Sequence, residues 1–157
     1  MTHLHQAEIF IDAPQAHVFR FFVDSDWLPK WLGTTARLDA QPGGEFRFEV
    51  VGGEWCVGEY VEIDPPRGVV FTWGWENPMM NLPPRSSVVE VDLTTEDGGT
   101  RLTLTHRGLP NEDSQTLHAD GWSRYLSRLE RVARGLEPGP DPGGETPEQA
   151  RQRLESR

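Results

Sequence analysis

The sequence predicts an α+β protein, in which a curved antiparallel sheet of about six to seven strands surrounds a long C-terminal helix. Apolar and polar residues alternate over several short stretches, for example Glu45–Val50 and Val69–Trp75, as they do in half-buried strands. Between residues 122 and 136 the apolar residues instead recur at every third or fourth position, which is typical of an amphipathic helix. Because tight turns join the strands, we expect an antiparallel sheet whose one face is covered by the helix.

The strands and short helices follow from these patterns in chain order. Leu4–Asp12 is predicted to be a strand, and two short helices follow it, the first beginning near Pro14 and the second carrying Trp27 and Trp31. From there the pattern predicts strands throughout, with turns at glycine-rich and proline-rich segments. The predicted strands cover residues 35–38, 45–50, 54–63, 69–75, 87–94 and 99–107.

The long helix is expected to begin with Asp113 or Ser114 as its N-cap and to end at Gly135. Its apolar positions should form one broad stripe facing the sheet, and charged residues fall between them. The apolar positions are Trp122, Tyr125, Leu126, Leu129, Val132, Ala133 and Leu136, and the charged ones are Arg124, Arg128, Glu130, Arg131 and Arg134.

The composition changes after Leu136, so we expect one folded domain over residues 1–136 and a tail over residues 137–157. Residues 137–144 are rich in proline and glycine, which predicts a flexible linker. Thr146–Gln149 has the form of a capping box, so residues 147–155 are expected to form a marginal short helix that docks only through Ala150 and Leu154.

Composition excludes several classes of function. The net charge of −10 argues against binding to nucleic acid or anionic lipid, because phosphates would be repelled. No apolar run of about 18 residues predicts a membrane span, and the N-terminus lacks the features of a signal peptide. Cys56 is the sole cysteine, so no internal disulfide can form. We therefore expect a cytoplasmic protein without membrane insertion.

Several motifs, in the same order along the chain, resemble the SRPBCC (START-like) superfamily. They are Ile9–Phe19, Trp27–Trp31, Gln41–Gly44, Gly58–Pro66, Val70–Trp73, Gly99–His106 and Gly121–Trp122. Within that superfamily the chain is most similar to the branch related to the C-terminal domain of the heat-shock-protein-90 ATPase activator. The resemblance covers about residues 5–136. It implies a helix-grip fold with a cavity between sheet and helix, but the family has no universal catalytic motif, so the fold does not decide the function.

Aromatic side chains on the expected inner faces are the main candidates for lining such a cavity, although they could equally form a filled core. The predicted ligand-binding residues are Trp27, Trp31, Phe46, Phe48, Phe71, Trp73, Trp75, His106, Trp122, Tyr125, Leu126 and Leu129. His106 is a candidate general base or ligand contact, and Glu59 is a candidate buried acid if its side chain faces inward. We expect no metal site and no cofactor.

Three functions remain open from the sequence. The first is a cytoplasmic protein that binds a small apolar or aromatic molecule between sheet and helix. The second is a protein-interaction module, with a chaperone or another protein as partner and the Trp75–Arg85 loop, which contains Met79 and Met80, as the contact. The third is an enzyme of the cyclase or dehydratase type, which would need His106 and Glu59 close together. The sequence allows a monomer or a homodimer.

Overall fold

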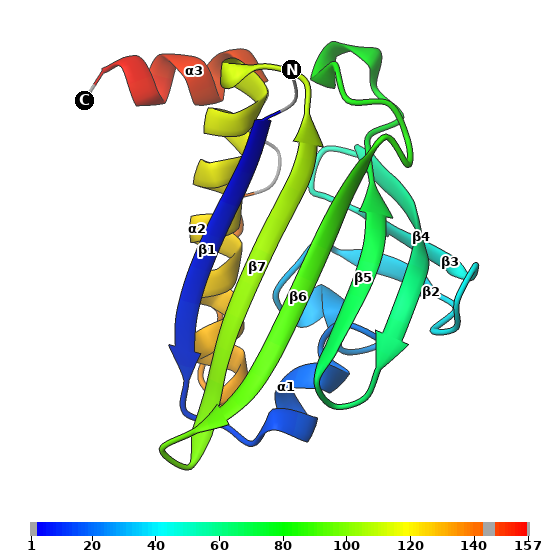
Figure 1. Cartoon of the computed structure of the whole chain (residues 1–157). Helices are drawn as coiled ribbons and strands as arrows, with labels where there is room; N and C mark the ends of the chain where they lie inside the picture. The colour runs from blue at the N-terminus through cyan, green and yellow to red at the C-terminus, as the bar shows by residue number, and fades with distance from the viewer. Residues whose placement is uncertain (1–2, 143–146, 157) are drawn as a thin grey trace.

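The computed structural model describes residues 3–142 and 147–156, and its centre is one curved antiparallel sheet (Figure 1). The seven strands lie in the order β1-β7-β6-β5-β4-β3-β2. They are β1 (His3–Ile11), β2 (Thr35–Leu38), β3 (Glu45–Glu49), β4 (Trp55–Asp64), β5 (Gly68–Trp73), β6 (Ser87–Glu96) and β7 (Gly99–Leu109). The predicted α+β class and the alternating strands are confirmed.

The long helix α2 (Glu112–Ala133) runs along one face of the sheet, behind β1 in Figure 1. The Nε2 group of Gln115 donates a hydrogen bond to the carbonyl oxygen of Leu4 at 2.5 Å, which fastens the first turns of the helix to β1. Residues from the inner faces of all parts of the sheet and from α2 form one hydrophobic core cluster. The predicted wrapping of a sheet around the C-terminal helix is therefore confirmed.

The short helices follow β1 as predicted, but the second is smaller than expected. The first is α1 (Gln15–Arg20), and the second is a single 3-10 turn, η1 (Leu28–Lys30). Pro29 lies in the first positions of that turn, where its missing N–H costs no helical hydrogen bond. A further 3-10 turn, η2 (Pro78–Met80), lies in the loop after β5.

The start of α2 differs from the prediction. Asn111 is the N-cap, because its backbone is extended and its side-chain oxygen accepts a hydrogen bond from the N–H of Ser114 at 2.8 Å. Asp113 lies in the first turn instead, where a negative charge suits the positive end of the helix dipole. At the other end, Gly135 has a φ of 81° just beyond the helix, as expected for a residue that ends one.

One charged residue of α2, Arg128, is buried, contrary to the prediction. Arg128, predicted to lie between the apolar positions, is only 7% exposed. Its Nε donates to the carbonyl oxygen of Trp31 at 3.1 Å, and one of its terminal nitrogens donates to the carbonyl of Gly139 at 2.8 Å. These backbone acceptors explain how a guanidinium can be buried there.

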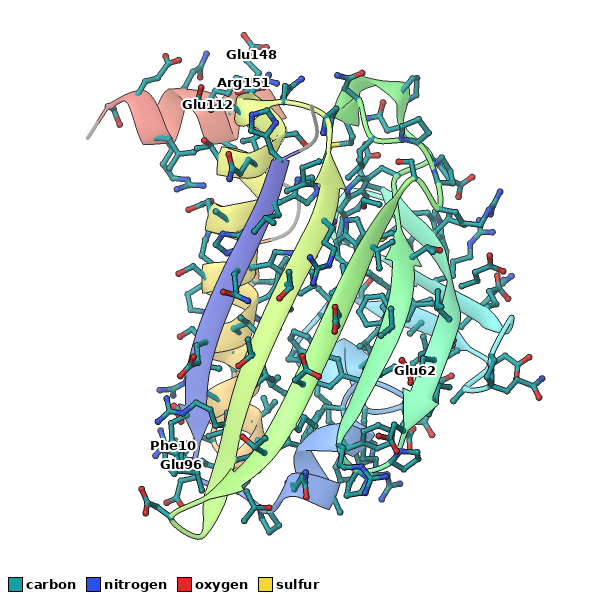
Figure 2. The ribbon with its side chains drawn as sticks, viewed as in Figure 1. Phe10, Glu62, Glu96, Glu112, Glu148 and Arg151 are labelled. Carbon is teal, nitrogen blue, oxygen red and sulfur yellow. The ribbon has the colours of Figure 1, made fainter. Side chains whose placement is uncertain are left out.

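The tail forms the helix α3 (Pro147–Glu155), which lies across the first turns of α2. Figure 2 shows Glu148 and Arg151 of α3 beside Glu112 at the start of α2. Of the two residues expected to dock this helix, Ala150 is buried and Leu154 is partly buried. Two ion pairs that the sequence did not predict join the helices: Arg151 with Asp113, and Arg153 with Asp120. The linker prediction for residues 143 and 144 lies outside the described residues.

Candidate functional site

Five aromatic side chains meet between the sheet and the first half of α2, and we call them the Trp–His cluster. Its members are Trp73, Trp75, His106, His118 and Trp122. All five are buried. Trp73 ends β5, Trp75 lies two residues beyond it in an isolated bridge to Cys56, His106 comes from β7, and the other two come from α2. The cluster therefore joins the sheet to the helix at the place where the family resemblance implies a cavity.

The backbone around Gly74 explains how two neighbouring tryptophans enter the cluster. Trp73 and Trp75 are two positions apart in extended chain, so their side chains lie on the same face. Gly74 lies between them, and a Cβ atom at that position would be 1.7 Å from the carbonyl oxygen of Pro83. Only glycine allows this close approach, through which the loop after β5 packs against the end of the strand.

His106 is the centre of a chain of hydrogen bonds. The indole N–H of Trp122 donates to its Nδ1 at 3.0 Å, and its Nε2 lies 2.9 Å from the hydroxyl oxygen of Ser87. That hydroxyl donates its own hydrogen to the carbonyl oxygen of Trp73 at 2.7 Å. Nε2 must therefore carry the proton and donate to Ser87, which makes His106 the neutral Nε2–H tautomer.

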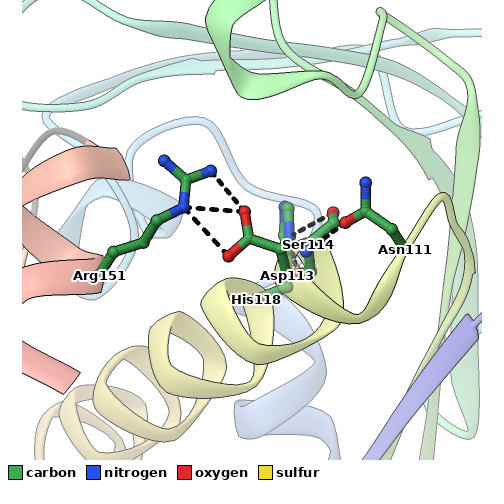
Figure 3. Close-up of polar contacts among 5 residues, drawn as sticks. All are labelled: Asn111, Asp113, Ser114, His118 and Arg151. Carbon is green, nitrogen blue, oxygen red and sulfur yellow. Dashed lines mark hydrogen bonds and ion pairs between the residues drawn. The ribbon is translucent and has the colours of Figure 1, made fainter. Parts of the chain in front are cut away.

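His118 is held as the opposite tautomer. Its Nδ1 lies 2.8 Å from the carbonyl oxygen of Ser114, one turn earlier in α2, and a carbonyl can only accept. Nδ1 therefore carries the proton, and Nε2 accepts from the indole N–H of Trp75 at 3.4 Å. Figure 3 shows this turn of α2, with Asn111, Ser114 and His118 beside the pair formed by Asp113 and Arg151.

Burial keeps both histidines uncharged. The pKa of His106 is lowered from its ordinary 6.5 to about 2, mainly by desolvation and to a smaller extent by the charges of His118 and His5. Desolvation likewise lowers the pKa of His118, against the opposing effect of its hydrogen bond to the Ser114 backbone. Both nitrogens of each ring already have partners, so His106 can act as a general base only if its bond to Trp122 breaks.

The other predicted ligand-binding residues line the same interior, with different degrees of burial. Phe46 stacks on Phe71 with ring centroids 4.0 Å apart, and Phe48 lies 5.3 Å from Trp73. Leu126 and Leu129 of α2 are buried. The structure thus brings these five residues together with the cluster in one core.

Three predicted ligand-binding residues remain: Trp31, which is bonded to a backbone carbonyl outside the cluster, and Trp27 and Tyr125, which are only partly buried. Trp31 is fully buried, and its indole N–H donates to the carbonyl oxygen of Phe21 at 3.0 Å. Trp27 is only partly buried, and the guanidinium of Arg20 lies 4.0 Å from its ring centre. Tyr125 is partly buried, and burial followed by the charge of Asp141 raises the pKa of its hydroxyl.

The residues considered for catalysis are not brought together. Glu59 is exposed, whereas Tyr60 beside it and His106 on β7 are buried. The condition for the cyclase-type enzyme, a close pair of His106 and Glu59, is therefore not met. Burial raises the pKa of the Cys56 thiol well above its usual value, which leaves little nucleophilic thiolate. Among residues 3–142 and 147–156, no group of three or more His, Cys, Asp or Glu could hold a metal ion.

A separate groove of about 600 Å³ lies at the ends of β4, β5 and β6. Its lining includes the carboxyl groups of Glu62, Asp64, Glu90 and Asp92. Desolvation, followed by the charges of Glu90 and Glu62, raises the pKa of Asp92. Such an acidic lining does not suit the apolar ligand that the sequence predicts, so the Trp–His cluster remains the candidate site.

Sequence reasoning missed two members of the hydrogen-bonded network. His118 lies four residues before Trp122, and this spacing places both on one face of a helix, so the apolar stripe could have been extended to it. Ser87 carries no local signal, because its role depends on the register that pairs β6 with both β5 and β7.

Comparison with known protein families identifies a match over residues 12–134 to the family described as "Activator of Hsp90 ATPase homolog 1-like protein". The chain belongs to this family. No curated protein matches the chain. The helix-grip fold of an AHSA1-like protein is compatible with binding of a small ligand or of a protein. Among the described residues, no helix is long and apolar enough to cross a membrane.

Solved structures agree with this assignment. An AHSA1-like protein from Rhizobium etli is 38% identical, with 90% of this chain and 88% of that chain covered and a TM-score of 0.72. A protein from Mesorhizobium loti is 20% identical, with 85% and 98% covered and a TM-score of 0.77. The Aha1 dimer from Colwellia psychrerythraea is 18% identical, with 86% and 96% covered and a TM-score of 0.71. The last two support the fold alone.

Proposed function

We propose that this AHSA1-like protein is a cytoplasmic binding protein for a small apolar or aromatic molecule, held between the sheet and α2. The observation that carries the proposal is the concentration of aromatic rings at this interface. The ring of Trp73 alone lies within 6.4 Å, centre to centre, of rings from β3, β5, β7 and α2. Large rings from the sheet and from α2 offer apolar area and edge contacts to a flat ligand.

A ligand screen tests this proposal. Lipids and aromatic metabolites are added to the purified chain, and binding is measured by the shift in thermal unfolding and by native mass spectrometry. A ligand that binds only the folded state stabilises it by about 2.7 kcal/mol at a hundred times its Kd. Stabilisation by apolar or aromatic compounds, with one bound molecule per chain, is the expected result; no stabilisation by any class would overturn the proposal.

A pair of variants locates the binding. Leu126→Phe enlarges a buried side chain on the inner face of α2, so it should weaken binding of any hit. Val61→Phe makes a similar enlargement at a side chain that is 52% exposed on β4, so it should leave binding unchanged. Equal effects of the two variants would contradict a site between the sheet and α2.

A second candidate function is protein interaction, which the description of the family favours. The Trp75–Arg85 loop was its predicted contact. In the structure Trp75 and Leu82 are buried, while Pro78 and Pro83 are exposed, so the prolines are the side chains a partner would meet. Binding of the purified cognate heat-shock protein 90, measured by pull-down with the wild type and with Pro78 and Pro83 replaced by alanine, tests this function. Equal capture of the wild type and of the alanine variant would exclude the loop as the contact. A second copy of this chain is an alternative partner, since the similar protein from Colwellia psychrerythraea is a dimer.

A further inference from the structure

The indole N–H groups of the buried tryptophans are paired, with one exception. Trp31, Trp75 and Trp122 donate to a carbonyl oxygen or a histidine nitrogen. Trp73 is only 4% exposed, and its Nε1 is buried without a hydrogen-bond partner among the residues that the structure describes. A buried donor without an acceptor is unfavourable and is rare in folded proteins, so it needs an explanation.

The groups around Trp73 cannot supply the missing acceptor. The ring of His106 lies 5.7 Å away, but its one acceptor nitrogen already binds Trp122. The ring of His118 lies 6.4 Å away, and its acceptor nitrogen binds Trp75. The hydrogen-bonding positions of both histidine rings are therefore filled, and the cluster leaves one donor open.

This pattern defines the chemistry of a complementary ligand. It would present one hydrogen-bond acceptor to Trp73 and apolar surface to the rings of Phe48 and Trp122, which lie 5.3 and 4.9 Å from Trp73. A charged acceptor would lose its hydration among five uncharged side chains, so a neutral oxygen is favoured. A flat molecule can present its face and its edge to the stacked and edge-on rings of this cluster.

We propose that the N–H of Trp73 is the polar anchor of the ligand site and selects flat, uncharged molecules with a carbonyl oxygen, such as aromatic ketones and quinones. This inference rests on the proposed binding function. It adds the ligand class and names the one residue that distinguishes a ketone from a hydrocarbon of the same shape.

Matched probe pairs test the inference, because the two members of a pair differ only in a carbonyl that replaces a methylene group. The pairs are acetophenone with ethylbenzene, benzophenone with diphenylmethane, and fluorenone with fluorene, so that three sizes are sampled. Affinities are measured by titration followed by the indole N–H signals of the ¹⁵N-labelled protein, which has six tryptophans. The Trp73 signal is assigned in the wild type by triple-resonance experiments and is checked with Trp73→Phe.

We expect the ketone of at least one pair to bind about tenfold more tightly than its hydrocarbon and to move the Trp73 N–H signal downfield. In Trp73→Phe the preference should fall to about one. Trp55→Phe, at a partly exposed tryptophan that begins β4, should keep the preference. If Trp73→Phe does not fold, the wild-type signal still decides, because it reports the hydrogen bond directly.

Two negative results have different meanings. Equal affinity within every pair, with an unmoved Trp73 signal, would overturn the inference and leave the binding function standing. Absence of binding by all six probes would overturn the binding function and the inference with it.

Discussion

The pH dependence of folding depends on His106 more than on any surface group. In the folded protein its pKa lies at about 2, whereas in the unfolded chain it has the ordinary value of 6.5. Between these values the unfolded chain takes up a proton that the folded protein does not, so the free energy of unfolding falls as the pH falls below 6.5. The loss is about 1.36 kcal/mol per pH unit, or about 2.7 kcal/mol at pH 4.5.

Other groups set the background to this effect. The pKa of His118 is lowered by the same cause, so it adds a loss in the same direction. Asp64, Glu96 and Asp113 have pKa values lowered by hydrogen bonds to arginines. They contribute stability that is lost only at lower pH, as they are protonated. A variant that lacks only His106 separates its share from the rest.

His106→Asn is that variant, because its side-chain oxygen can still accept from Trp122 but does not titrate. Urea unfolding of both proteins, followed by tryptophan fluorescence, gives the free energy of unfolding at intervals from pH 7.5 to 4.5. At pH 7.5 the variant should be less stable by about 1–3 kcal/mol, since Ser87 loses its donor and the fit is poorer. By pH 4.5 this difference should have shrunk by about 2.7 kcal/mol. A difference that does not change with pH would refute a neutral, buried His106.

Three further substitutions test the structure at other points. Gly74→Ala should destabilise the fold strongly, because the new Cβ atom would lie 1.7 Å from the carbonyl oxygen of Pro83. Gly121→Ala has open space around it in α2 and should instead stabilise the fold by up to about 1 kcal/mol. Thermal unfolding measures both effects. Tyr60→Phe removes the hydroxyl that donates to the carbonyl of Phe22 at 2.8 Å and should cost about 1 kcal/mol in urea unfolding. Arg151→Ala removes one of the two ion pairs between α3 and α2, so amide hydrogen exchange of residues 148–155 should become faster. High salt, which weakens both pairs, should have the same effect on the wild type, and unchanged exchange there would mean that the ion pairs do not hold α3.

The strands and the inner-face aromatics could be predicted from the sequence because they follow from a local rule. Alternation puts Trp73 and Trp75 on one face whatever the rest of the chain does. The N-cap of α2 could not be decided in this way, because Asn111, Asp113 and Ser114 are all good cap residues within four positions. The choice of Asn111 depends on how the chain leaves β7.

Contacts between distant segments could not be predicted from the sequence, because the partners meet only in the folded protein. Arg128 looks like a surface residue until the carbonyl of Trp31, 97 positions away, is placed beside it. The neutral state of His106 likewise depends on Ser87 and Trp122, which only the strand register and the helix position bring to its two nitrogens. Local patterns predict which face a side chain lies on, but the partner it meets there is set by the tertiary fold.

The most direct test of the binding account is to find where a ligand lies. Fluorenone, or whichever of the six probes binds most tightly, is added to the labelled protein, and nuclear Overhauser contacts between probe and protein are measured. The account predicts contacts to the indole ring protons of Trp73 and Trp122, between the sheet and α2. Contacts confined to exposed apolar side chains such as Leu4 and Val61 would contradict it.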